Sequence, residues 1–169
     1  MRLRLISMTS GRFRFFIGSN VILDYFYGEK RAKEVIEAAK SLGDVFINGI
    51  VLTEVSIRYL KDSTGKKSYT LKHSPQLVRE VDKSPLYSIL DGFSYLSDNA
   101  LIGEEAIVLM DIYGLLPNDA IILATCKFYG IDYLISFDTD FKRACDGERI
   151  TLVDSKEKLE ELIKIGDSQ

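Results

Sequence analysis

Short apolar runs alternate along this chain with segments in which apolar residues recur every three or four positions. The runs are predicted to be buried strands at 13–17, 45–47, 93–96, 133–136 and 150–153. The intervening segments are predicted to be helices, because their apolar residues fall on one helical face. Strands that alternate with helices in this way are typical of a parallel sheet with helices on both faces. We therefore predict an α/β fold, a three-layer α/β/α sandwich with a central parallel sheet.

Capping residues predict where several helices begin. Ser19 or Asn20 is expected to cap the helix that follows the first strand. Asn118 is expected to cap an apolar helix that begins at Asp119. A third helix is predicted over 51–61, with an acidic residue in its first turn. The polar stretch from 61 to 73 is predicted to be a loop or a helical hairpin.

The bulk composition constrains the class of protein. A length of 169 residues predicts one domain over 13–169, preceded by a flexible arm over 1–12. The net charge of −3 argues against a generic, charge-driven nucleic-acid binder, but it permits a local basic face. Cys126 and Cys145 match no metal-binding or redox spacing, which favours a reduced, cytoplasmic protein. No apolar run is long enough for a membrane span, so no membrane association is expected.

Acidic residues occur at strand ends and helix starts. Asp138 follows the fourth strand, Asp119 opens a helix, and Glu54 lies near the start of another. Because sites in such folds gather at the carboxyl ends of the strands, we expect these side chains to share a cleft. Carboxylates in one cleft repel each other unless a cation lies between them. Mg²⁺ or Mn²⁺ is the expected cation, and such an ion can polarise a phosphate and activate water.

Each of these acids also has an ordinary structural explanation. Asp119 could serve only the dipole of its helix, and Glu54 could be a first-turn acid of the same kind. Asp138 could cap the helix that follows it, and Asp140 could be a solvated acid in that turn. The prediction of a metal site therefore depends on their shared placement and not on any one residue.

The order of these residues resembles the PIN domain, the fold of VapC-type toxin ribonucleases. The most specific stretches are 113–125 (YGLLPNDAIILAT) and 136–141 (SFDTDF). The resemblance implies Mg²⁺- or Mn²⁺-dependent cleavage of RNA, a cognate antitoxin as a partner, and self-association into a homo-oligomer. The catalytic and metal-binding acids that it implies are Glu54, Asp119 and Asp138, with Asp140 as an accessory acid; the supporting polar residues are Ser19 and Asn20.

One position departs from the family pattern. The first aspartate of the family, at the end of the first strand, aligns with Gly18, which supplies no ligand. Gly18 could instead be a turn residue with unusual backbone dihedral angles. Because the charge of the ligands sets metal affinity, its presence is expected to weaken metal binding. Two hypotheses remain: an endoribonuclease with impaired activity, or a catalytically inactive PIN domain that binds RNA or protein as a scaffold. A receiver-like phosphotransfer domain is a poor match, because the first strand ends in glycine.

Basic residues are concentrated between positions 58 and 83, where seven Lys and Arg residues accompany three acids. Such a local excess could bind phosphate groups near the cleft, and neighbouring tyrosines such as Tyr69 could stack on bases. A solvated loop of mixed charge explains the same stretch equally well. His73, the one histidine, is expected to be a surface residue. The predicted RNA contacts are Arg58, Lys61, Lys66 and Lys67.

Overall fold

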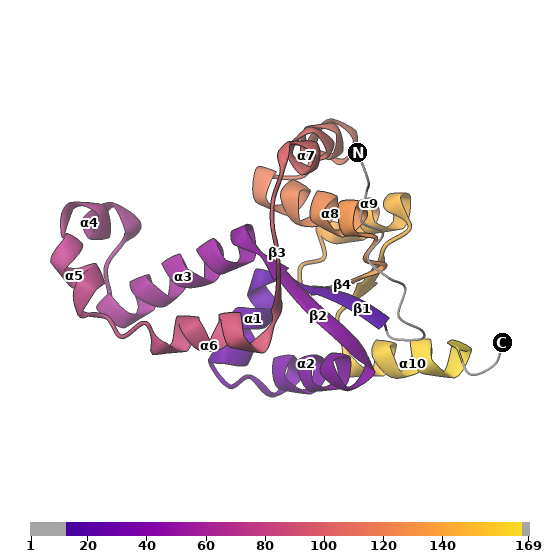
Figure 1. The fold of residues 1–169 in the computed structure, drawn as a ribbon, viewed down its shortest axis with the longest axis horizontal. Helices are drawn as coiled ribbons and strands as arrows, with labels where there is room; N and C mark the ends of the chain where they lie inside the picture. The colour runs from indigo at the N-terminus through magenta and orange to yellow at the C-terminus, as the bar shows by residue number, and fades with distance from the viewer. Residues whose placement is uncertain (1–12, 167–169) are drawn as a thin grey trace, which may run out of the picture.

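The computed structural model describes residues 13–166, so the predicted flexible arm over 1–12 lies outside the described residues. Five strands form one parallel sheet in the order β3-β2-β1-β4-β5. Figure 1 shows α7, α8 and α9 over one face of this sheet and α1, α2 and α10 over the other, which confirms the predicted sandwich. The strands are β1 (Phe13–Ile17), β2 (Gly43–Asn48), β3 (Ser94–Leu96), β4 (Tyr133–Ile135) and β5 (Thr151–Val153). The helices are α1 (Ser19–Phe26), α2 (Lys30–Leu42), α3 (Gly49–Thr64), α4 (Ser68–His73), α5 (Pro75–Glu80), α6 (Ser84–Gly92), α7 (Ala100–Tyr113), α8 (Pro117–Tyr129), α9 (Phe141–Glu148) and α10 (Lys156–Gly166).

The central strand β1 lies at the middle of the core. Its last three residues, Phe15, Phe16 and Ile17, are fully buried. A strand covered by helices on both faces is apolar without alternation, which is why this run could be recognised from the sequence. No single helix among residues 13–166 is long and apolar enough to cross a membrane; α7 and α8 meet that test only as a pair, bent by 117°.

The helix starts differ from the prediction at three places. The N-cap of α1 is Gly18, because its backbone N–H still pairs with the Ile135 carbonyl (2.8 Å) and stays extended. The N-cap of α8 is Leu116, because Pro117 fixes a helical φ at the first position and disfavours helical geometry before it. Asn118 therefore lies inside the helix and caps nothing.

The start of α3 is also earlier than predicted. Asn48, at the end of β2, is its N-cap, and the Asn48 side chain accepts a hydrogen bond from the Val51 backbone N–H (3.2 Å). The helix begins at Gly49, so Glu54 lies in the second turn and not the first. Glu54 lies six residues beyond Asn48, the last residue of β2, which is nearly two helical turns.

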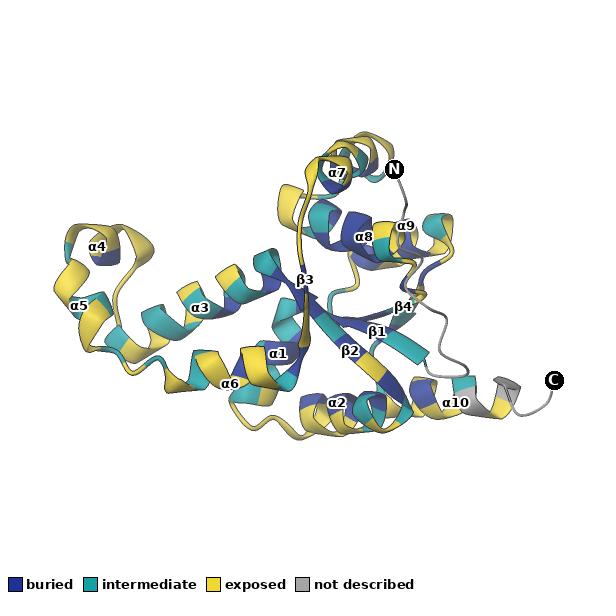
Figure 2. Cartoon of the chain, in the orientation of Figure 1, coloured by how far each residue is buried: buried dark blue, intermediate teal, exposed yellow. Residues whose placement is uncertain are grey.

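The part of the chain that connects β2 to β3 forms a helical arm, which projects from the sandwich. We define the arm as residues 57–92, which comprise the distal half of α3 together with α4, α5 and α6 (Figure 1). Of the two alternatives predicted for 61–73, the structure has the helical hairpin: the end of α3, a turn with left-handed Gly65 (φ 66°), and α4. Two contacts attach the arm to α1 and its end: the Phe26 and Tyr59 rings lie 5.4 Å apart, and the Tyr27 hydroxyl donates to Asp62 (2.6 Å). Figure 2 shows that α4 and α5, at the far end, are largely exposed.

Candidate active site

Polar side chains from four segments line one small pocket at the carboxyl ends of β1 and β4. The pocket has a volume of about 190 Å³. Of the predicted site residues, Glu54, Asp119, Asp138, Ser19 and Asn20 all line it. Asp140 does not line this pocket. The full lining is Gly18, Ser19, Asn20, Glu54, Asp119, Ile122, Ser136, Asp138 and Phe141.

Glu54 is held by donors on both of its carboxylate oxygens. Ser19, in the first turn of α1, donates its hydroxyl to Oε2, and Asn118, in the first turn of α8, donates Nδ2 to Oε1 (2.6 Å). Buried Val51 and Val55 fix the rotation of α3 against the core. Three helices therefore orient this one carboxylate. The sequence prediction missed Asn118 because it treated the residue as a cap; its position next to Asp119 was the available signal.

Asp138 lies in a loop that is tied to α1. Asn20 accepts a hydrogen bond from the Phe137 backbone N–H (3.3 Å), and its Nδ2 donates to the Ser136 hydroxyl (3.5 Å). The Asp138 backbone N–H donates to that same hydroxyl (3.1 Å). One carboxylate oxygen of Asp138 accepts from the Asp140 backbone N–H (2.9 Å). The loop is thus fixed by local polar contacts, and Ser136, which was predicted only as a strand residue, is one of its anchors.

Asp119 shows the electrostatic strain of the pocket. Its pKa is raised from the ordinary value of 3.8 to about 6. The largest cause is partial burial, which disfavours the charged form, and the negative charges of Asp138, Glu54 and Asp140 add to it. Although Asp140 does not line the pocket, its charge therefore reaches Asp119. The acids lie near enough to repel each other, which is what a bound cation would relieve.

Comparison with known proteins identifies the family. The PIN domain family model matches residues 15–147. The chain belongs to the PIN domain family. It is 36% identical to a protein named Ribonuclease VapC2 from Methanocaldococcus jannaschii over 77% of this chain and 88% of that protein.

Solved structures resemble this PIN domain as well. A toxin–antitoxin complex from Klebsiella pneumoniae matches with 25% identity and a TM-score of 0.51, over 75% of this chain and 88% of that one. VapBC2 from Rickettsia felis, bound to a DNA fragment from its promoter, matches with 17% identity and a TM-score of 0.59, over 85% of this chain and 99% of that one. The second likeness supports the fold alone.

Gly18 lies in this PIN domain where the resemblance predicts an aspartate. Its backbone is extended (φ −72°, ψ 156°), a conformation open to any residue, so the suggested role as a turn with unusual dihedral angles is wrong. A Cβ at this position would lie 3.3 Å from the Ile135 carbonyl oxygen and 3.4 Å from the Ser136 side chain. The first contact is tight, so the Ile135 carbonyl must shift by a few tenths of an ångström, whereas the second is an ordinary van der Waals distance. The backbone therefore admits an aspartate, while the local packing resists it slightly.

The pocket of the PIN domain has the donor chemistry of a hard cation but not a closed ligand set. Glu54, Asp119 and Asp138 offer only carboxylate oxygens, as Mg²⁺ and Mn²⁺ prefer. Within residues 13–166, however, no three His, Cys, Asp or Glu side chains are grouped closely enough to hold a metal ion. Both oxygens of Glu54 are already engaged, and Gly18 contributes no carboxylate. The residues fit a divalent cation by type, and a fourth acid is missing from the set that the family pattern predicts.

The predicted RNA contacts lie outside the pocket. Arg58 donates Nε to both oxygens of Asp62 (3.1 and 2.9 Å), so its charge is compensated within the helix. Lys61 lies further along α3, while Lys66 and Lys67 lie in the connection to α4. Any part that these lysines play in binding is therefore separate from the chemistry of the carboxylates.

Proposed function

We propose that this PIN domain is a metal-dependent endoribonuclease, the toxin of a toxin–antitoxin pair, and that Gly18 impairs its activity. The observation that carries the proposal is the convergence of Glu54, Asp119 and Asp138 on one pocket. The 36% identity to a relative named as a ribonuclease supports the activity, and the likeness to a toxin–antitoxin complex supports the biological setting.

The residues have distinct parts in this proposal. Mg²⁺ or Mn²⁺, when bound, would polarise the scissile phosphate and supply activated water. Glu54, Asp119 and Asp138 would hold the ion, with Asp140 adding charge nearby. Ser19 and Asn118 orient Glu54. Asn20 and Ser136 fix the loop that carries Asp138.

The proposal also includes partners and a location. A cognate antitoxin would present Arg or Lys side chains, because their positive charges can pair with the carboxylates of the pocket. The substrate class is RNA, the compartment is the cytoplasm, and the chain self-associates as the family resemblance implies. Addition of a peptide of the antitoxin would then compete with the cation for the same acids.

The test of the proposal compares the chain as it stands with Gly18→Asp on a pool of structured and single-stranded RNA in Mg²⁺ or Mn²⁺. We expect Gly18→Asp to cleave at least about tenfold faster, because an added carboxylate strengthens the metal site. Gly18→Ala is the matched control, since it adds the same Cβ beside Ile135 and Ser136 without a ligand. Gly18→Asp combined with Asp119→Asn controls for contaminating nucleases. EDTA must abolish cleavage in every case.

A second candidate function is favoured by the same glycine and by the unclosed ligand set: a catalytically inactive PIN domain that binds RNA or protein as a scaffold. If neither the chain nor Gly18→Asp cleaves RNA, and neither binds Mn²⁺, the nuclease proposal fails and the scaffold remains. If both cleave equally, three acids suffice, and the inferred impairment by Gly18 is wrong.

A further inference from the structure

Positive charge is concentrated at the end of the arm. We define the arm tip as residues 66–79, which comprise the connection to α4, α4 itself and most of α5. There is no Asp or Glu between Asp62 and Glu80, so the tip carries only basic charges in a chain whose net charge is −3. The basic residues of the tip are Lys66, Lys67, Lys72, His73 and Arg79.

These charges are free to meet a ligand. All five basic side chains are exposed, and within residues 13–166 none of the lysines and arginine of the tip forms an ion pair. Two other basic residues of the arm show the contrast. Arg58 is paired with Asp62, and the Lys83 ammonium donates to the backbone carbonyls of Val78 and Val81. The arm thus uses Arg58 and Lys83 for its own structure and leaves the charges of the tip uncompensated.

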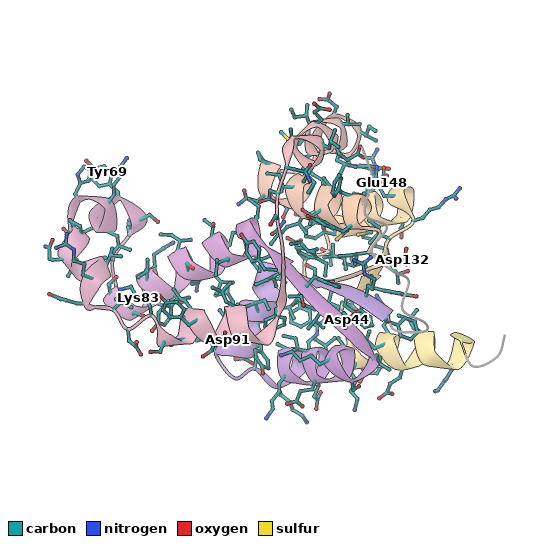
Figure 3. The ribbon with its side chains drawn as sticks, viewed as in Figure 1. Asp44, Tyr69, Lys83, Asp91, Asp132 and Glu148 are labelled. Atoms are coloured by element: carbon teal, nitrogen blue, oxygen red, sulfur yellow. The ribbon has the colours of Figure 1, made fainter. Side chains whose placement is uncertain are left out.

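An exposed aromatic pair lies among these charges. The Tyr69 side chain is 76% exposed, and its ring centroid lies 4.5 Å from that of His73. Figure 3 places Tyr69 on α4, at the outer end of the arm. Lysines that bind phosphates, next to an aromatic ring on which a base can stack, are the combination used to bind single-stranded nucleic acid. An acidic protein segment would pair with the lysines but would not need the exposed ring, so the combination favours RNA.

The arm tip and the carboxylate pocket are connected by one helix. Glu54 and the end of α3 at Thr64 belong to the same α-helix, and the rise per residue places the tip about 15–18 Å from Glu54 along its axis. A stacked strand advances about 3.4 Å per nucleotide, so about five nucleotides are needed to span that distance. A trinucleotide in the pocket cannot reach the tip, whereas a 20-nucleotide RNA can occupy both.

We propose that the arm tip is a second RNA-binding site, which holds a single-stranded segment about five or more nucleotides from the scissile phosphate through Lys66, Lys67 and Lys72 and through stacking on Tyr69. This inference rests on the proposed function, because it supposes that the pocket acts on RNA. It assigns the predicted RNA contacts differently: Lys66 and Lys67 belong to the site, whereas Arg58 does not.

The experiment measures binding of an unstructured 20-nucleotide RNA, labelled with fluorescein, to the full chain in EDTA by fluorescence anisotropy. The tip variant Lys66→Ala, Lys67→Ala, Lys72→Ala is compared with a control variant that loses the same charge from α2 and α10, Lys30→Ala, Lys33→Ala, Lys156→Ala. We expect the tip variant to bind at least about tenfold more weakly and its slope of log K against log salt to fall by about 2, as expected for three lost phosphate contacts on a single strand. The control variant should bind within about twofold of the original chain.

A second measurement separates stacking from charge. Tyr69→Ala should weaken RNA binding about fivefold or more, because each base stacked on an aromatic ring contributes to affinity. It should leave binding of inorganic polyphosphate, which has no bases, unchanged. Equal RNA binding by the tip and control variants would overturn the proposal. So would equal losses of RNA and polyphosphate binding on Tyr69→Ala, or tighter binding of a glutamate-rich peptide than of the RNA, which would assign the tip to an acidic protein partner.

The outcomes also distinguish the two proposals. If the arm tip binds RNA as expected but Gly18→Asp cleaves nothing, the nuclease proposal fails and the tip stands as the RNA site of a scaffold. If Gly18→Asp cleaves, and the tip substitutions in that background change neither the cleavage of the 20-nucleotide RNA nor its binding, the tip inference fails alone. Melting temperatures of all variants check that each one folds.

Discussion

Replacement of Asp119 by asparagine should stabilise the metal-free protein, because it removes a negative charge that is partly buried and lies near other carboxylates. The pKa of Asp119 is raised from 3.8 to about 6 by burial and by the neighbouring acids. A rise of that size corresponds to about 3 kcal/mol as an upper bound. The side chain is partly exposed, so solvent screening reduces the expected gain to about 1 kcal/mol. For a chain of this length, that gain raises the melting temperature by about 2–4 °C.

The sign of the pH dependence follows from proton binding. The folded state holds the Asp119 proton more tightly than the unfolded state does. The contribution of Asp119 to the free energy of unfolding therefore falls as the pH rises from about 3.8 to about 6, and it is constant above that pH. The advantage of Asp119→Asn in EDTA should therefore be largest at pH 7.5 and smaller at pH 5.0. Asp111→Asn, on the exposed side of α7, is the control and should have no such trend. Mg²⁺ or Mn²⁺ should stabilise the original chain more than Asp119→Asn. A lower melting temperature for Asp119→Asn in EDTA at pH 7.5 would refute the reasoning.

Two further predictions concern the framework of the site. Asn48→Ala removes the fully buried N-cap of α3 and a hydrogen bond to Thr125 (2.9 Å), which should cost about 2–3 kcal/mol of folding free energy. In a thermal melt, the melting temperature should therefore fall by about 5–10 °C. A change under about 1 °C would contradict this account. Gly43→Ala would place a Cβ 1.9 Å from the Phe13 carbonyl oxygen and should destabilise the β1–β2 pair by more than about 2 kcal/mol in urea unfolding. Gly103→Ala, at the fourth residue of α7 with open space around it, should instead stabilise the protein by up to about 1 kcal/mol. Equal effects of the two substitutions would show that the close approach at Gly43 is not the cause.

The sheet could be predicted from the sequence because each strand contains a short apolar run, even where a polar residue such as Arg14 or Asp44 lies within the strand. All five predicted strands exist, with ends that differ by one or two residues. The arm was harder to predict, because the stretch from 61 to 80 is polar and has few apolar residues at helical spacing. Its α4 and α5 are short and mostly exposed, and contact with the rest of the arm defines them more than any pattern of their own. Helix α6 begins at Ser84, one residue before Pro85, and was missed although Leu86, Ile89 and Leu90 recur at helical spacing.

The acids of the site could be predicted because a parallel sheet brings its strand ends together. Glu54, Asp119 and Asp138 were expected to meet, and all three line one pocket. The hydrogen bond from Asn118 to Glu54 could not be foreseen, because it joins residues 64 positions apart and depends on the packing of α3 against α8. Local sequence patterns predict the helix to which a residue belongs. They do not predict that Asn118 of α8 donates a hydrogen bond to a residue of α3.

Stability and catalysis make opposite demands on position 18. Burial, together with the negative charges already in the pocket, raises the pKa of Asp119 to about 6 without a carboxylate at Gly18. A further acid at that position would add to the repulsion between the carboxylates, and its Cβ would crowd the Ile135 carbonyl oxygen. A cation removes the electrostatic part of that cost but not the packing part. With glycine at position 18, the stability of the pocket depends less on a bound metal ion. Metal binding is expected to be weaker for the same reason, because a carboxylate at position 18 would be one of the groups that hold the ion.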